Sequence, residues 1–239
     1  MHFELKKLLI FSRLISKEPK FTLYYDSWVT ACTIGLLQLK KTSQLTRALL
    51  VGTKSGDLQF IILYENDLKI LWHKNLSVRI NDIKIADVTN DGNNEIIVAT
   101  DDSYLKILDP EGKRLNYLKV TPGRPLRILV HDIDGDNTNE ILVGGADGTF
   151  KVFHNTSLNS IIFRLKWETK VKTSIKDICI SKDSENDFEN IIFGGYNREI
   201  RSLYDFNYGN KEAKKIKRRN PNSELLIDFI HLFKLTDKV

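Results

Sequence analysis

A short apolar run followed by a small residue occurs four times along the chain and constrains the fold more than any other sequence feature. The four copies are Leu49-Leu50-Val51-Gly52, Ile96-Ile97-Val98-Ala99, Ile141-Leu142-Val143-Gly144 and Ile191-Ile192-Phe193-Gly194. Their first residues are 47, 45 and 50 positions apart. Regular spacing of this length indicates a repeat architecture in which each repeat is one supersecondary unit.

The flanks of each copy repeat as well. An alternating apolar segment precedes each run, and a turn, a third strand-like segment and a more variable fourth one follow it. Alternation with a period of two indicates strands, and Gly56 and Gly148 suit tight hairpins. Four strands in roughly 40 to 50 residues are typical of a propeller blade. We therefore predict an all-β fold, a small β-propeller with units at about 28–76, 77–121, 122–170 and 171–219.

The two ends of the sequence together hold about one more unit. Residues 225–235 resemble another first strand, and residues 1–26 contain two further strand-like segments. A blade that mixes strands from both ends would remove the exposed sheet edges of the ring. We therefore predict a single domain over 1–239 with about five blades, the last one built from 1–26 and 222–239. The alternative is an open arc that another chain completes.

An acidic loop precedes the third apolar run. Its oxygen-bearing side chains stand at positions 1, 3, 5, 7 and 9 of the loop: Asp132, Asp134, Asp136, Thr138 and Glu140. Alternate positions on a tight loop turn side chains toward one point, and Ca²⁺ takes six to eight oxygen ligands, often including a backbone carbonyl. The spacing therefore predicts a structural Ca²⁺ site, and Ca²⁺ is the one cofactor that the sequence indicates.

A second, weaker copy of this loop precedes the second apolar run. It comprises Asp87, Thr89, Asp91, Asn93 and Glu95. Thr89 stands where the other loop has a carboxylate, so we expect a lower cation affinity here. Both loops have an alternative interpretation, because Asp and Asn side chains also hold tight turns by accepting hydrogen bonds from nearby backbone N–H groups.

The segment 132–148, with 87–99 as a weaker copy, resembles the FG-GAP or VCBS-type repeat of integrin-alpha-like propellers. Among intracellular proteins, the chain is similar to the propellers of Bardet–Biedl-complex subunits and of KICSTOR FG-GAP proteins. This resemblance implies a propeller fold, loops that often bind Ca²⁺, and a role in assembly or scaffolding. The hairpin 145–153 and the strand ends at Trp72 and Trp167 also resemble the outer strands of quinoprotein-like propellers.

The amino-acid composition indicates the cellular compartment of the protein and the kinds of partner it can bind. Two cysteines, Cys32 and Cys179, lie in apolar strand-like runs, so we predict buried free thiols in a reducing compartment and a cytoplasmic protein. The apolar run near the N-terminus is too short for a signal peptide, and no run is long enough to span a membrane. The net charge is +5, with a basic run at Lys211–Arg219. We interpret this run as a solvated loop; contact with a membrane surface is the weaker alternative, and no aromatic residue in it indicates nucleic-acid binding.

No nucleophile or phosphate-binding signature stands out in the sequence. We therefore expect a non-enzymatic propeller for protein–protein interaction and scaffolding, whose partners are other proteins, in a complex or by self-assembly. The alternative is a quinoprotein-like or carbohydrate-active propeller that acts as an enzyme or binds a cofactor. That alternative needs carboxylates that converge, whereas these lie in loops of separate blades.

Overall fold

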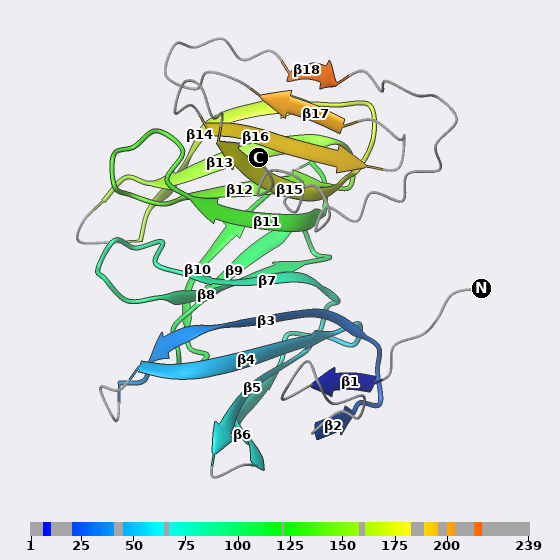
Figure 1. Cartoon of the computed structure of the whole chain (residues 1–239), viewed down its shortest axis with the longest axis vertical. Coiled ribbons are helices and arrows are strands. Elements are labelled where there is room, and N and C mark those ends of the chain that lie inside the picture. The colour runs from blue at the N-terminus through cyan, green and yellow to red at the C-terminus, as the bar shows by residue number, and fades with distance from the viewer. Residues whose placement is uncertain are drawn as a thin grey trace, which may run out of the picture.

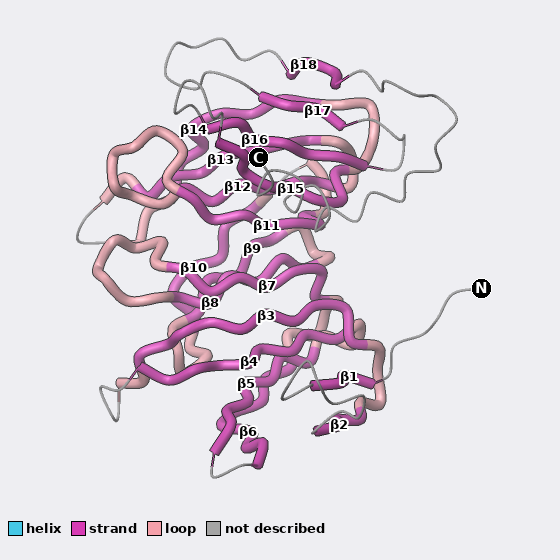
Figure 2. The backbone as a smooth tube through the Cα atoms, in the orientation of Figure 1, coloured by secondary structure: helices cyan, strands magenta, loops and turns pink. Residues whose placement is uncertain are grey.

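The computed structural model describes a chain built from strands. The described residues are 7–10, 21–40, 45–64, 67–120, 122–157, 161–182, 189–195, 200–203 and 213–216. All regular elements in these ranges are strands joined by loops (Figure 2). The predicted all-β fold is therefore confirmed, and the described ranges include no helix of the length and apolarity needed to cross a membrane.

Four antiparallel sheets of four strands each make up most of the structure. The first sheet contains β3 (Val29–Gln38), β4 (Leu45–Thr53), β5 (Asp57–Tyr64) and β6 (Asp67–Asn75). The second contains β7 (Ile80–Ala86), β8 (Glu95–Thr100), β9 (Tyr104–Leu108) and β10 (Arg114–Lys119). The third contains β11 (Pro125–His131), β12 (Glu140–Gly145), β13 (Thr149–Asn155) and β14 (Phe163–Lys170). The fourth contains β15 (Ile175–Lys182), β16 (Glu189–Gly195), β17 (Ile200–Leu203) and β18 (Ala213–Ile216).

The four sheets are propeller blades that follow one another as an open arc (Figure 1). Within each blade the strands pair in sequence order, and the main contacts between blades run from the first strand of one blade to the first strand of the next. A separate two-stranded sheet, β1 (Lys7–Ile10) with β2 (Phe21–Tyr24), lies beside the first blade. The predicted closing blade also needs residues 222–239, which lie outside the described residues, as does most of the basic run around β18.

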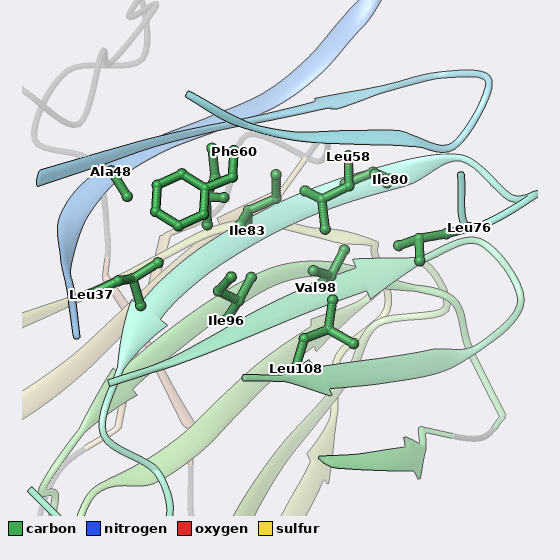
Figure 3. Packing of buried hydrophobic residues seen from close by; sticks show 11 residues of the cluster. Leu37, Ala48, Leu58, Phe60, Leu76, Ile80, Ile83, Ile96, Val98 and Leu108 are labelled. Carbon is green, nitrogen blue, oxygen red and sulfur yellow. The ribbon is translucent and has the colours of Figure 1, made fainter. Parts of the chain in front are cut away.

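Apolar side chains from neighbouring blades form the core. Between the first two blades, Phe60 and Leu58 pack against Ile80 and Ile83, all of them buried (Figure 3). Two similar clusters fill the next two interfaces. Since each buried side chain of this size contributes roughly 1.5–3 kcal/mol, these interfaces hold the arc together.

The small residue after each apolar run has a packing cause. A Cβ atom placed on Gly52 would lie 2.6 Å from Cγ2 of Ile80, and one on Gly144 would lie 2.5 Å from Cγ2 of Ile175. Real side-chain contacts are longer than this, so the isoleucine of the next blade needs the missing side chain. The repeated small residue in the sequence is therefore a consequence of how each blade packs against the next.

Each first strand also contains the same irregularity. The pairing register shifts after its first residue in all four blades, which leaves one residue without a partner on the second strand. In the first two blades that residue forms a hydrogen bond to the next blade. The Thr30 hydroxyl donates to the Ile80 carbonyl at 2.5 Å, and Nδ2 of Asn81 donates to the Pro125 carbonyl at 2.9 Å.

The two thiols differ from the prediction. Both cysteines are free, but Cys32 is exposed and Cys179 is only partly buried. The prediction of a buried thiol is therefore wrong for Cys32. The cause is its position on the face of β3 that no other described blade covers.

Candidate functional site: two carboxylate loops

The third-blade loop, residues 132–139 between β11 and β12, is a tight turn organised by Asp132. Oδ1 of Asp132 accepts hydrogen bonds from the Gly135 and Asp136 amides at 2.8 and 3.2 Å, and its Oδ2 accepts one from the Asn137 amide at 2.9 Å. Gly135 and Asn137 both have positive φ, of 74° and 63°. Glycine and asparagine adopt this conformation more readily than other residues, so the sequence of the loop fits its shape.

Lys166 of β14 reaches into this loop. Its ammonium group donates to Oε1 of Glu140 at 2.8 Å and to Oδ2 of Asp134. Glu140 is completely buried, and its Oε2 accepts the Ile133 amide at 3.0 Å. Burial raises the pKa of Glu140, although the hydrogen bonds from Lys166 and Ile133 oppose this effect. Burial alone would lower the pKa of Lys166, but the hydrogen bonds to Asp134 and Glu140 outweigh it and raise that pKa.

The second-blade loop, residues 87–94 between β7 and β8, has the same turn. Oδ1 of Asp87 accepts the Asn90 amide at 2.7 Å and its Oδ2 accepts the Gly92 amide at 2.8 Å. Asn90 and Gly92 have positive φ, of 60° and 83°. Glu95 again lies beneath the turn, where Oε2 accepts the Val88 amide at 3.0 Å. The two loops are therefore copies of one structure as well as of one sequence.

The two loops differ at the buried glutamate. In the second blade, Oε1 of Glu95 accepts the Thr89 hydroxyl at 3.2 Å, and no described lysine or arginine pairs with this loop's carboxylates. Burial raises the pKa of Glu95 to about 7; hydrogen bonds from Val88 and Thr89 lower it, whereas the charges of Asp87 and Asp91 raise it further. The pKa of the Glu95 carboxyl group therefore lies near neutral pH, where the group gains or loses a proton as the pH changes.

The structure brings most of the predicted ligands together. One carboxylate oxygen from each of Asp87, Asp91 and Glu95 lies within 4.8 Å of the others, and the same holds for Asp132, Asp134 and Asp136. The Asn93 amide donates to Asp91 at 2.8 Å, so the backbone of this position holds a carboxylate in place.

The remaining ligand candidate of the third-blade loop also has a structural role. The Thr138 amide and hydroxyl donate to Oδ1 of Asp136 at 2.8 and 2.5 Å. Thr138 therefore positions Asp136. In the turn, its side-chain oxygen acts as a hydrogen-bond donor.

The donor atoms fit a hard cation better in the second-blade loop. All three of its clustered carboxylates are free of an ammonium partner among the described residues. In the third-blade loop, Lys166 already supplies a positive charge to Asp134 and Glu140. Oδ1 of Asp134 is buried without a hydrogen-bond partner. Lys166 was not among the predicted residues, because nothing in the spacing links β14 to this loop.

A third polar cluster has the residue types of a hydrolase triad but a different geometry. Asp57 accepts hydrogen bonds from the Ser55 hydroxyl at 2.5 Å and contacts Nε2 of His73 at 3.0 Å. The hydrogen bond from Ser55 lowers the pKa of Asp57 most strongly. Because the serine bonds to the carboxylate and not to the imidazole, no base is placed to activate it. This cluster holds the turn between β4 and β5.

Comparison with known proteins supports the fold. A family model described as the Lambda-carrageenase beta-propeller domain matches residues 58–122, which is less than half of the chain. No curated protein matches the sequence. Two similar solved structures are crystal structures of BBS1N in complex with ARL6DN, soaked with lead or with mercury. Their TM-scores are 0.55 and 0.53 at 13% and 14% identity, over 78% and 79% of this chain.

The matches cover only part of these related structures. The aligned region spans 55% of each BBS1N chain, so the present chain corresponds to about half of that protein. In all, 770 solved chains resemble this structure. A fold this common hosts many functions, so function has to be argued from particular sites. The comparisons establish a β-propeller fold.

Proposed function

We propose that the protein is a non-enzymatic propeller that binds other proteins, and that the face carrying the two carboxylate loops is its binding platform. The single observation that carries this proposal is the structural likeness to BBS1N, which was crystallised in complex with ARL6DN. The polar clusters of the described residues add support, because they lie in separate loops and do not converge on one reacting atom.

The geometry of the loop face suits such a platform. Nδ2 of Asn139 donates to the Asp87 carbonyl at 2.8 Å, and Nδ2 of Asn94 donates to the Leu36 carbonyl at 2.9 Å. Each loop is thus fastened to the blade before it, and Asp91 and Asp136 remain exposed on the surface. A rigid surface loses little conformational entropy on binding, and its acidic character favours a basic partner.

Charge reversal on this face tests the proposal. Partners are first isolated by cross-linking and affinity purification, and the purified partner is then titrated against the full chain. We expect Asp91→Lys and Asp136→Lys to weaken binding at least tenfold, while Asp67→Lys, at an exposed acid that begins β6, leaves it unchanged. Equal binding by all three variants would contradict the choice of face.

A carbohydrate-active propeller is the second candidate function. The observation that favours it is the Lambda-carrageenase beta-propeller model, which matches residues 58–122 and includes the second-blade loop. The test is release of reducing ends from a sulfated galactan by the purified chain. Turnover that exceeds the background rate would replace the scaffold proposal with this one; a bound quinone detected by absorbance would do the same for the quinoprotein alternative.

We also propose a structural cation of the FG-GAP type, Ca²⁺. The sequence predicts the third-blade loop as the stronger site, but we propose the second-blade loop in its place, because Lys166 competes with a cation in the third-blade loop. The three clustered carboxylates of the second-blade loop, without an ammonium partner among the described residues, support this choice. Calorimetry with Ca²⁺ tests it, and the double variant Asp134→Ala/Asp136→Ala in the third-blade loop is the matched control. Absence of heat for the native chain at millimolar Ca²⁺ would leave the acids with the turn-holding role alone.

The proposal places the protein in the cytoplasm, which the two free thiols support. The basic run Lys211–Arg219 remains a solvated segment in this proposal, with no nucleic-acid partner. Sedimentation with vesicles that contain anionic lipid tests the alternative of membrane contact. Binding that the run's charge-neutralised variant loses would establish that alternative.

A further inference from the structure

The first blade, at one end of the arc, has a sheet face on which apolar side chains remain exposed (Figure 1). Ten large apolar side chains are exposed among the described residues, and half of them lie on this one face: Ile34, Leu36, Leu45, Leu63 and Ile70. Their exposed fractions range from 47% to 68%. Single exposed apolar side chains are common on soluble proteins, whereas a group of them on one face indicates an interaction surface.

The strand pairing places these side chains on one face. Ile34 of β3 pairs with Leu49 of β4, and Leu49 pairs with Ile61 of β5. Ile61 pairs in turn with Ile70 of β6. Paired residues of an antiparallel sheet point to the same side, so a row of four apolar side chains crosses the whole blade. The other exposed members stand two or four residues from this row along their own strands and therefore belong to the same face.

The opposite face of this sheet packs against the second blade. Leu37, Leu50 and Phe60 on that side are completely buried in the first core cluster. In the second blade, the residues equivalent to Leu49 and Ile61 are Ile96 and Leu108, which are completely buried in the same cluster. The outer face of the first blade thus has the composition of a packed sheet face, although no described blade lies against it.

The chemistry of this outer face fits a second copy of itself. Over residues 32–38, 45–51, 59–63 and 68–70, Arg47 is the only charged side chain on the face, and its long stem allows the guanidinium group to reach the edge. A charged partner would lose hydration against these apolar groups, whereas two apolar sheet faces bury each other as in a β-sandwich. A two-fold axis, the commonest symmetry of soluble oligomers, brings the same apolar residues of two chains together.

The size of the face is close to the lower limit for a stable dimer. Its four strands contain 8 to 10 residues each. With strands about 4.8 Å apart and a rise of about 3.3 Å per residue, the whole face measures roughly 500 Å². Two such faces bury at most roughly 1,000 Å², the smallest area expected of a specific interface. We propose that the protein forms a two-fold dimer in which the outer faces of two first blades pack against each other, with a dissociation constant in the micromolar range.

Sedimentation velocity of the full chain across the micromolar range tests this proposal. We expect a monomer–dimer equilibrium, and Ile70→Asp should weaken it at least tenfold because the new carboxylate would be buried in the contact. The matched control is Leu165→Asp, since Leu165 occupies the equivalent position of the third blade and is 46% exposed, against 49% for Ile70. This control should leave the equilibrium unchanged. Asp91→Lys and Asp136→Lys should leave it unchanged too, so the dimer and the partner-binding loop face are tested separately.

The thiol of Cys32 provides a second measurement, which needs no substitution in the apolar face. Cys32 is exposed and lies two residues before Ile34, on the same side of β3. In a chain that carries Cys179→Ser, we expect its reaction with a maleimide to slow down as protein concentration rises, in step with dimer formation. This measurement decides the matter if Ile70→Asp does not fold.

Four results would overturn the proposal. A chain that stays monomeric with a reactive Cys32 leaves the face free for a different protein, and a monomer with a protected Cys32 covers the face with a segment of its own. A dimer that Ile70→Asp does not weaken uses another surface. Species that grow beyond two copies indicate a head-to-tail contact, because a two-fold contact closes at two.

Discussion

The carboxylate loops of the second and third blades share a backbone and differ in how the buried glutamate is satisfied. Each turn is held by an aspartate that accepts amides on both oxygens, and each places a glutamate beneath it. In the third blade Lys166 pairs with Glu140, whereas in the second blade Thr89 supplies only a hydroxyl to Glu95. The comparison shows that this motif builds a turn. It also shows that a lysine of the same chain, Lys166, can supply the positive charge beside the carboxylates.

The largest effect is expected from removal of the internal cation. Lys166→Met leaves Glu140 completely buried without its ammonium partner, and the loss of one member of such a pair destabilises a fold by about 3 kcal/mol. Urea denaturation at pH 7 measures this change in the free energy of unfolding. Lys170→Met is the control. The side chain of Lys170 is mostly exposed and its Nζ lies 3.7 Å from Oδ2 of Asp147, so this substitution removes only an exposed ion pair. Equal effects of the two substitutions would show that the buried pair contributes no more to the free energy of unfolding than the exposed pair does.

A smaller effect is expected from the pH dependence of the second-blade loop. The pKa of Glu95 is raised from 4.5 to about 7 in the folded chain, so the folded state holds a proton that the unfolded state has released between these pH values. The free energy of unfolding therefore falls as pH rises through this window. At 1.36 kcal/mol per pKa unit, the loss between pH 5 and 8 is about 2 kcal/mol.

The variant Glu95→Gln isolates this contribution, because glutamine does not titrate. We expect the stability difference between Glu95→Gln and the unsubstituted chain to shift in favour of the variant as pH rises from 5 to 8. Chemical denaturation across this range measures it. A constant difference at every pH would mean that Glu95 ionises in the folded chain as it does in the unfolded chain.

The smallest effect is expected from added Ca²⁺. A ligand at ten times its dissociation constant stabilises the folded state by about 1.4 kcal/mol, and we expect a matching rise in melting temperature. Asp91→Asn should abolish this rise and its equivalent in the third blade, Asp136→Asn, should preserve it. The rise should also grow between pH 6 and 8, because the cation competes with the proton on Glu95. The reverse pattern in the two variants would assign the cation to the third-blade loop.

Much of the fold can be predicted from the sequence because each blade buries the same positions. The apolar runs and the small residue after them appear at regular spacing since Gly52 and Gly144 must admit an isoleucine of the next blade. The two carboxylate loops are also predictable, because each turn is held by hydrogen bonds within its own loop, from backbone amides to Asp87 or to Asp132.

Two features depend on long-range contacts and escape prediction. Lys166 lies where β14 shifts its register against β13, between Leu165 and Trp167, which leaves it unpaired and free to reach the loop. No sequence pattern announces such a shift. The exposure of Cys32 depends on the presence or absence of a neighbouring blade, and an apolar strand has the same sequence in either case.

The side-chain hydrogen bonds between blades bear on how the chain assembles during synthesis. Two of them have the donor in the earlier blade and the acceptor in the later one, Thr30 to Ile80 and Asn81 to Pro125. Two others run the opposite way, Asn94 to Leu36 and Asn139 to Asp87, and all four join blades that are neighbours in the sequence. Since the main contacts between blades also join sequence neighbours, each blade can dock as soon as the first strand after it leaves the ribosome. Assembly can therefore proceed in the direction of translation, with little waiting for distant segments.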